Sequence, residues 1–404
     1  MRKSERSTVT SRLRQAVPAV VVMFVVAHCA HHLVTALPVP LLPYIRDEFS
    51  LDYTRAALVV SAFSVPYGFA QLPSGWLADR FGARRMVCVG ISGVAFAGLL
   101  VGLSTHYVVL LVALALMGAL GGGYHPSAPT LISKAVEPER RGRALGMHMI
   151  GGSIAYFVAP LIAAGIAVAL GWRSAFIILA VPSVVFGFVF YRMLSRAKEG
   201  ESSSCRAKDV SETEDAGVNW PRLVTFLLLS CFTAAIVLAC VSFIPLFLVD
   251  KYNYAEHGGA AAISLFYSTG LWAAVAGGYA SDRLGNVRVV AILALLSGPA
   301  LVLLGAGGSD ILVMALLLYL GVALYARAPA SESFVLSQSP SRHRSTVLGL
   351  YYFGAMEGNG VLAPVVGYLI DRFGFMTAYT VSGIAMICVA LVCSLALLRW
   401  RHAR

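Results

Sequence analysis

Three histidines lie close together in the first long apolar segment of the chain, at His28, His31 and His32. Spacings of three and four residues place their imidazoles on one face of a helix, near the middle of a membrane span. A polar face at membrane depth normally points into a helix bundle or a wet cavity. The fourth long apolar segment adds an adjacent pair, Tyr124 and His125. We therefore expect these five side chains to line one polar pathway.

Imidazole groups at such a position suit three kinds of chemistry. A protonated histidine can bind an anionic substrate, a titrating one can relay a proton, and a neutral one can ligate a transition metal. The spacing does not choose among these roles, and a histidine that is only hydrogen-bonded within the bundle is a fourth alternative. We assign all five residues to substrate binding and His32 also to proton coupling, and we assign no metal ligand.

Charged residues within apolar segments add a second set of candidates. Arg327 lies in the tenth segment at the repeat position of Tyr124, and an arginine there costs at least about 2.5–3.5 kcal/mol unless it is paired or hydrated. Glu332 is five residues further on and off the same helix face, so Glu357 in the eleventh segment is the better partner. We expect Arg327 to bind a substrate anion while Glu357, or Glu332, exchanges a proton. The alternative is a permanent Arg327–Glu357 pair that only fixes packing.

The elements that must position these residues are transmembrane helices. The 404-residue chain is 58% hydrophobic and 13% charged, with a mean hydropathy of +0.77. About 20 apolar residues span a bilayer, so the predicted fold class is all-α integral membrane, with 12 transmembrane helices. The apolar segments are 17–44, 56–78, 86–104, 107–134, 143–170, 174–194, 221–249, 260–281, 288–306, 310–337, 345–370 and 376–398.

The first six segments and the last six repeat each other at a constant offset of 203 residues. This repeat predicts two pseudo-symmetric six-helix bundles in the same orientation, with the substrate site between them. The matched positions are Gly75 with Gly278, Asp79 with Asp282, Arg80 with Arg283, Gly82 with Gly285, Arg85 with Arg288, Pro126 with Pro329, Arg141 with Arg344 and Leu145–Gly146 with Leu348–Gly349.

The repeat also sets the expected domain boundaries. The N-terminal bundle covers 17–195 and the C-terminal bundle covers 221–398. The polar stretch 196–220 is typical of a flexible cytoplasmic linker. Residues 1–16 and 399–404 form short cytoplasmic tails.

The formal net charge of +11 follows from this topology. On one side of the predicted membrane, the tails, the linker and the loops hold 25 of the 31 Lys and Arg residues, and the opposite loops hold five. The positive-inside rule then places both termini in the cytoplasm and the chain in the cytoplasmic membrane. Topology therefore accounts for the basic charge, and we predict no nucleic-acid partner.

The segment from Gly75 to Arg85 ends the second predicted helix and opens the third. Glycine permits a tight turn, and arginines anchor at anionic headgroups. The segment and its copy at 278–288 resemble the cytoplasmic signature of the major facilitator superfamily, although Ala83 replaces a usual basic residue. The resemblance implies a gating role, beside the alternative that the loop is only a topology anchor. The gating candidates are Asp79, Arg80, Gly82, Arg85, Asp282 and Arg283.

Two shorter patterns resemble branches of the same superfamily. The fifth helix carries Gly151-Gly152 and Ala159-Pro160, which is similar to the Gly-Pro signature of drug/proton antiporters. The segments 27–32 and 121–126 look like the fosmidomycin-resistance branch, which implies that His28 and His125 face the cavity. Both resemblances imply efflux.

These features together predict a secondary active transporter that moves a small organic solute by alternating access, through proton-coupled efflux. Proton-coupled uptake of an organic anion and a histidine-based transition-metal carrier are the alternatives, and a non-transporting membrane receptor is a third. The chain has no Walker loop or other enzyme motif, so we predict neither an enzyme nor a cofactor. The expected partners are a small-molecule substrate, protons and membrane lipids, and the expected state is a monomer.

Overall fold

The computed structural model describes residues 19–137, 140–197, 218–340 and 344–399. Every regular element within these ranges is a helix, as the sequence predicts. The N-terminal half contains α2 (Ala19–Thr35), α3 (Leu42–Phe49), α4 (Tyr53–Phe81), α5 (Ala83–Cys88), the π-helix η1 (Val89–Gly93), α6 (Val94–Gly102), α7 (Tyr107–Gly121), α8 (Tyr124–Ala135), α9 (Arg141–Leu170) and α10 (Trp172–Ala197). The C-terminal half contains α11 (Trp220–Ser242), α12 (Ile244–Tyr252), α13 (Glu256–Ser268), the 3-10 helix η3 (Thr269–Leu271), α14 (Ala273–Leu284), α15 (Asn286–Ala306), α16 (Asp310–Gln338), α17 (Arg344–Tyr352), the π-helix η5 (Phe353–Glu357) and α18 (Asn359–Arg399).

The described helices account for twelve membrane crossings. Nine helical segments are long and apolar enough to span a bilayer. The segment Val347–Arg399 has 53 residues and turns at Gly374, where φ is 78°, so it crosses twice. The pair Glu256–Leu271 and Ala273–Leu284 meets at 43° and forms one broken span. The apolar helix α2 is the remaining crossing.

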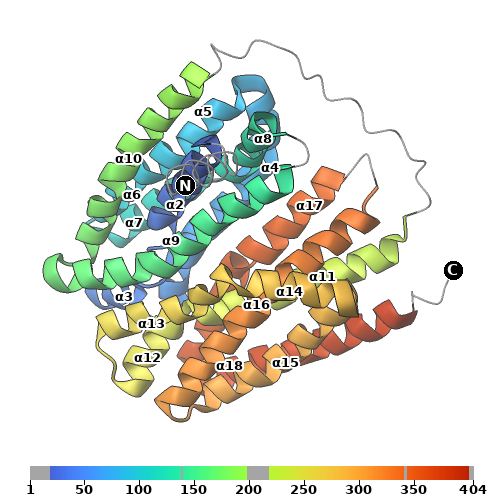
Figure 1. The fold of residues 1–404 in the computed structure, drawn as a ribbon. Coiled ribbons are helices and arrows are strands. Elements are labelled where there is room, and N and C mark those ends of the chain that lie inside the picture. The colour runs from blue at the N-terminus through green and yellow to red at the C-terminus, as the bar shows by residue number, and fades with distance from the viewer. Residues whose placement is uncertain (1–18, 138–139, 198–217, 341–343, 400–404) are drawn as a thin grey trace, which may run out of the picture.

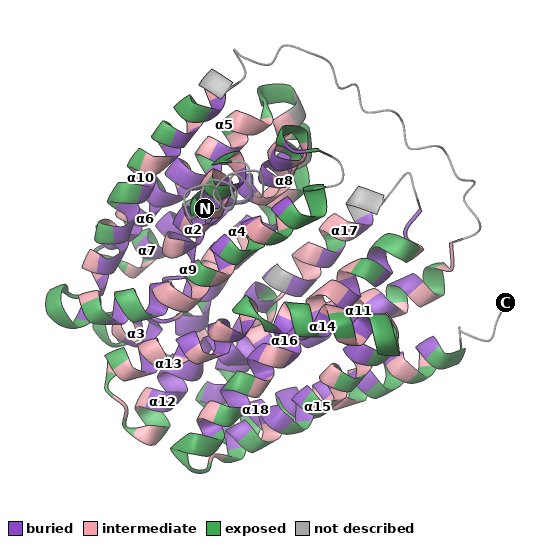
Figure 2. Ribbon diagram, in the orientation of Figure 1, coloured by how far each residue is buried: buried purple, intermediate pink, exposed green. Residues whose placement is uncertain are grey.

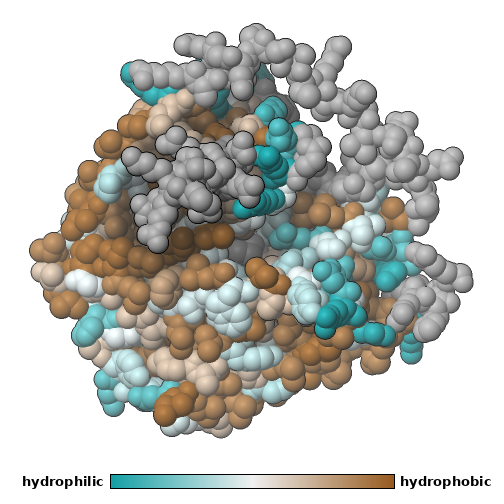
Figure 3. Space-filling view, viewed as in Figure 1, coloured by the Kyte–Doolittle hydropathy of each residue, from teal (hydrophilic) through white to brown (hydrophobic). Residues whose placement is uncertain are grey.

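The helices form two bundles, α2 to α10 and α11 to α18, which lie side by side in Figure 1. Buried residues gather between the helices of each bundle, and exposed ones lie on the outer flanks (Figure 2). Those flanks are largely hydrophobic in Figure 3, and they include exposed Val185 and Phe188 on α10 and Leu296 and Leu303 on α15. An apolar outer surface of this kind is suited to contact with lipid tails rather than water.

The two ends of the molecule differ in how the bundles meet. We call the end where α10 stops at Ala197 and α11 starts at Trp220 the linker end, and the end that carries α3 and α12 the distal end. The bundles pack together through α4 with α18 and through α9 with α13. The predicted tails and most of the predicted linker lie outside the described residues.

Small residues allow the close contact between the two halves. A Cβ atom added to Gly360 would lie 2.9 Å from the Cβ of Ser64, and one added to Gly367 would lie 2.6 Å from the carbonyl oxygen of Tyr53. The Ser61 hydroxyl also donates to the Gly360 carbonyl at 2.6 Å. Helices α4 and α18 therefore touch backbone to backbone, which small side chains permit.

Candidate functional site

The three histidines of α2 are buried together in the N-terminal half. His28, His31 and His32 are 2%, 0% and 6% exposed. Their ring centroids lie 4.8 Å apart for His28 and His32 and 4.7 Å apart for His31 and His32. Because α2 is a regular helix over these positions, the spacing seen in the sequence places all three on the side that faces the bundle.

The start of α8 brings Tyr124 and His125 against these rings. Tyr124 stacks on His31 with centroids 4.5 Å apart and planes 10° apart. His125 lies 5.3 Å from both His28 and His32. The five residues that the sequence assigned to one pathway therefore lie together. We call these five residues and His148, which is described below, the histidine cluster.

His148 on α9 is a member that the sequence analysis missed. Its ring stacks on His28 with centroids 4.2 Å apart and planes 17° apart. The close approach of α9 to α2 places it there, since a Cβ added to Gly151 would lie 2.1 Å from the Val25 carbonyl oxygen. His148 precedes Gly151 and Gly152 by three and four residues and so shares their helix face. That spacing was the available signal.

Hydrogen bonds hold most of these imidazoles in fixed orientations. The Nδ1–H of His28 donates to the His148 carbonyl at 2.8 Å, and that of His148 donates to the Phe24 carbonyl at 3.0 Å. His31 donates from Nδ1 to the Gly90 carbonyl at 2.8 Å, and its Nε2 lies 3.0 Å from the Tyr67 hydroxyl. Both nitrogens of His31 are thus satisfied. The Nε2 atoms of His28 and His148 are buried and have no hydrogen-bond partner among the described residues.

Arg327 occupies the corresponding depth in the C-terminal half. It is 5% exposed, and its Nη1 group donates to the carbonyl and the hydroxyl of Ser230 on α11, at 2.7 and 2.9 Å. The Ser230 hydroxyl lies 2.7 Å from that of Ser331. Among the described residues, no other nitrogen of Arg327 has an acceptor, and no carboxylate lies within 4.0 Å of it.

The expected pairing of Arg327 with Glu357 is therefore absent. Glu357 lies at the end of η5 and faces the other half, since a Cβ added to Gly68 on α4 would lie 2.8 Å from the Glu357 Cβ. The opposite side of this turn packs on α11, where a Cβ on Gly354 would lie 2.8 Å from the sulfur of Cys231. Glu357 therefore faces α4 and not Arg327, which sequence spacing could not reveal.

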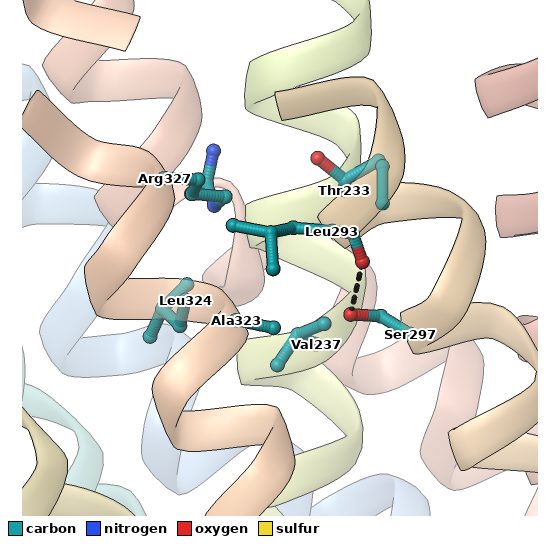
Figure 4. A pocket seen from close by; sticks show the side chains of 8 residues that line it. Thr233, Val237, Leu293, Ser297, Ala323, Leu324 and Arg327 are labelled. Atoms are coloured by element: carbon teal, nitrogen blue, oxygen red, sulfur yellow. Dashed lines mark hydrogen bonds between the residues drawn. The ribbon is translucent and has the colours of Figure 1, made fainter. Parts of the chain in front are cut away.

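Figure 4 shows the surroundings of Arg327 on its other side. A small pocket lies inside the C-terminal bundle between α11, α15 and α16, with Arg327 at its upper edge in this view. The Ser297 hydroxyl turns back to the Leu293 carbonyl, so the pocket wall is mostly apolar. The lining residues are Thr233, Val237, Leu293, Ala294, Ser297, Ala323, Leu324 and Arg327.

Two other polar residues, the candidate Glu332 and the buried Asn359, lie apart from the histidine cluster. Glu332 on α16 lies beside Tyr352 on α17. The side chain of Asn359 is buried, and its Oδ1 atom has no partner among the described residues. Neither residue lies in the histidine cluster.

The gating candidates lie at the linker end. The side chain of Asp79 is outside the described part of the structure. Gly82 has φ 91° where α4 ends, and Gly285 has φ 87° where α14 ends, so both repeats make the same glycine-dependent turn. Arg80 stacks over the Trp76 ring at 5.4 Å, and Arg283 stacks over the Tyr279 ring at 4.3 Å. The remaining candidates, Arg85 and Asp282, lie in α5 and α14.

A set of contacts at the distal end joins the two halves, and the sequence analysis missed it. Asp371 on α18 accepts hydrogen bonds from the amides of Tyr53 and Thr54 at 2.8 and 2.9 Å and from the Thr54 hydroxyl at 2.5 Å. Asp250 on α12 pairs with Arg46 and accepts the Tyr53 hydroxyl at 2.6 Å. We call these five residues the distal latch.

A second sequence repeat could have revealed this latch. Residues 367–374, Gly-Tyr-Leu-Ile-Asp-Arg-Phe-Gly, share six of eight positions with residues 75–82, Gly-Trp-Leu-Ala-Asp-Arg-Phe-Gly. The offset differs from 203, so a search at constant offset passes over it. The two copies end α4 at the linker end and the first crossing of α18 at the distal end.

Comparison with known proteins gives one family and several relatives. The family model described as Major Facilitator Superfamily matches residues 24–276 and 256–404. The probable sulfoacetate transporter SauU of Cupriavidus necator is 27% identical over 384 residues, which cover 87% of each chain. The multidrug resistance protein MdtG of Enterobacter lignolyticus is 25% identical over 380 residues, which cover 90% of this chain and 88% of that protein.

The fold also resembles solved structures. A bacterial homolog of the human lysosomal transporter Spinster, in an inward-facing and occupied conformation, aligns with a TM-score of 0.74. The alignment has 18% sequence identity and covers 94% of this chain and 96% of that one. At that identity the likeness supports the fold.

Proposed function

Because this chain belongs to the Major Facilitator Superfamily, we propose that it carries a small organic anion across the cytoplasmic membrane by alternating access. The family makes it a multi-pass membrane transporter and not an enzyme. The observation that supports an anion is Arg327, a buried guanidinium that has no carboxylate partner among the described residues.

Arg327 has unused capacity to bind such a substrate. A guanidinium carries five N–H donors in a planar fork that matches a carboxylate or sulfonate. Only Nη1 is engaged, by Ser230, so the rest of the fork can take two oxygens of an anion. The name of the sulfoacetate relative, which specifies a small compound with two acidic groups, agrees with this class.

Glu357 supports coupling of transport to protons. It is 9% exposed and lies where η5 of one half meets Gly68 of the other. An ionised carboxylate without a cation is costly at membrane depth, whereas water can stabilise it when the halves separate. Rocking of the halves would therefore change its protonation, which is how a proton gradient can drive a substrate.

The charge distribution gives the proposed orientation. The excess of Lys and Arg at the linker end supports an orientation with that end and both termini in the cytoplasm. In this orientation the distal latch joins the two halves on the outer side of the membrane.

Efflux of a lipophilic drug is the second candidate. It is favoured by the 25% identity to the multidrug resistance protein over nine tenths of this chain and by Gly151-Gly152, where α9 packs tightly on α2. The two candidates differ in the charge of the substrate. An anion would bind to Arg327, whereas binding of an apolar drug would not depend on it.

Counterflow in proteoliposomes tests the proposal. Vesicles loaded with sulfoacetate, a hexuronate or a small dicarboxylate are diluted into the labelled compound, and accelerated exchange identifies the substrate. We expect Arg327→Gln to abolish exchange and Arg55→Gln, at an exposed distal arginine, to preserve it. Exchange of none of the anions, together with exchange of lipophilic drugs that survives Arg327→Gln, would favour the second candidate.

A further inference from the structure

We propose that His28, His32 and His125 form a three-imidazole site for a divalent transition-metal ion such as Zn²⁺. One ring nitrogen from each residue lies within 4.8 Å of those from the other two. Two helices supply the ligands, His28 and His32 from α2 and His125 from α8. The inference goes beyond the proposed transport of an organic anion and does not depend on it.

The spacing of the three rings is suited to a single ion. Their centroids form a nearly equilateral triangle with sides of 4.8, 5.3 and 5.3 Å. Zinc binds imidazole nitrogen at about 2.1 Å, so ligand nitrogens around one tetrahedral ion lie about 3.4 Å apart. Binding of one ion to all three therefore requires the ligand nitrogens, which now lie within 4.8 Å of one another, to move closer together by ring rotation.

A hydrogen bond behind the His28 ring leaves a nitrogen lone pair for a metal, and a contact behind the His32 ring can hold that ring in place. His28 donates its Nδ1–H to the His148 carbonyl, so in the neutral ring Nε2 carries the lone pair. That Nε2 atom is buried and has no hydrogen-bond partner in the described structure. His32 bonds through Nδ1 to the Thr35 hydroxyl at 2.9 Å. Histidines that bind metals characteristically use their second nitrogen for such a contact, which fixes ring orientation.

His31 shows what a purely structural histidine looks like in the same cluster. One of its nitrogens meets the Gly90 carbonyl and the other meets the Tyr67 hydroxyl. Packing therefore satisfies His31 completely but leaves Nε2 of the adjacent His28 unsatisfied. Burial of a polar nitrogen without a hydrogen-bond partner is unfavourable. A metal ion bound to Nε2 of His28 would supply the missing partner.

The composition of the site selects the ion class. Three neutral imidazoles favour Zn²⁺, Cu²⁺ or Ni²⁺ over Mg²⁺ and Ca²⁺, which prefer oxygen ligands. His28 and His32 are buried, whereas His125 is partly exposed. With three protein ligands, a tetrahedral ion keeps a fourth position for water or an anionic ligand.

Metal binding to the purified full-length protein tests the proposal. Calorimetry with Zn²⁺ should give one ion per chain, and Co²⁺ should give the intense visible absorption of a tetrahedral site. We expect His28→Ala and His125→Ala to weaken Zn²⁺ binding by more than about tenfold, because each removes a ligand. His31→Asn should retain binding. His106→Ala, at an exposed position outside the cluster, controls for surface binding.

Another variant tests whether weaker binding could result from misfolding of the ligand variants. Thr35→Val keeps the side-chain shape and all three ligands but removes the contact to His32, and it should weaken Zn²⁺ binding roughly tenfold. The proposal is overturned if the wild-type protein shows no saturable binding. It is also overturned if binding persists unchanged in both ligand variants, or if only His106→Ala removes it.

Discussion

Asp371 and Thr54, from opposite halves of the molecule, are joined by two hydrogen bonds, one from the Thr54 amide at 2.9 Å and one from its hydroxyl at 2.5 Å. Because Thr54 is in the first turn of α4, the carboxylate satisfies amides that have no partner within the helix. A charge from one half thus stabilises a helix end in the other, and the halves cannot separate at the distal end without losing this contact.

Asp371→Asn should shift the protein toward conformations that are open at the distal end. The amide keeps an acceptor oxygen but removes a negative charge worth about 0.3–1 kcal/mol at a helix N-terminus, so the population ratio should change roughly two- to fivefold. Electron–electron distance measurements between spin labels on α3 and α12 report the shift. Asp310→Asn is the matched control, because that carboxylate bonds only Tyr254 within the C-terminal half. Equal distance distributions in both variants would refute the latch.

Glu48 should make stability depend on acid pH. Its carboxylate accepts hydrogen bonds from Arg173 and from Trp172, and the Arg173 contact is the main cause that lowers the pKa of Glu48 below its usual range. A lowered folded-state pKa gives stability that is present above the unfolded value of about 4.3 and is lost as the pH falls through the folded value. Because this carboxylate is partly exposed, the effect should be small.

Thermal unfolding in detergent from pH 6 to pH 3 measures this dependence. The midpoint of the wild-type protein should fall more steeply below about pH 4 than that of Glu48→Gln, which has no charge to lose. Parallel curves for the two proteins would show that the Arg173 contact contributes nothing to folding.

Two glycines on α9 should respond oppositely to the same substitution. A Cβ at Gly152 would lie 2.6 Å from Cε1 of His28, whereas one at Gly165 would have no neighbour within 4 Å. We expect Gly152→Ala to destabilise the protein by about 1–3 kcal/mol through crowding of His28. Gly165→Ala should be neutral or stabilising by up to about 1 kcal/mol. Unfolding midpoints of the two variants in detergent decide this, and a matched loss in both would contradict the close packing.

Glu357→Gln should separate substrate exchange from proton coupling. The neutral amide keeps the shape of the side chain but cannot release a proton. We expect counterflow of the identified substrate to persist while transport driven by a pH gradient falls at least tenfold. Glu332→Gln, which alters the contact to Tyr352, tests the other candidate. If only the Glu332 variant loses gradient-driven transport, the role belongs to Glu332.

Local spacing in the sequence accounts for the parts of the site that lie on one helix. His28, His31 and His32 cluster because helical periodicity dictates it, and the repeat of Gly82 at Gly285 predicted the same turn twice. The apolar segments likewise gave the twelve crossings. These features depend on a few neighbouring residues, which is why sequence alone suffices.

Contacts between helices were harder to predict. His148 stood alone in its segment, and its place beside His28 depends on how closely Gly151 lets α9 approach α2. The predicted partner of Arg327 was wrong because Glu357 turns to the opposite side of its helix. Neither relationship is encoded in the spacing along one segment.

The π-helix η5 has a consequence for how the two repeats can move. Fourteen positions separate Gly146 from Pro160, whereas fifteen separate Gly349 from Pro364. The counterpart of the continuous helix α9 in the C-terminal half is formed by α17, η5 and the start of α18, and it contains one more residue. The wide turn Phe353–Glu357 accommodates this extra residue. We expect α9 to move as a rigid body and its counterpart to bend at this turn. The two halves, although symmetric in fold, should therefore move differently.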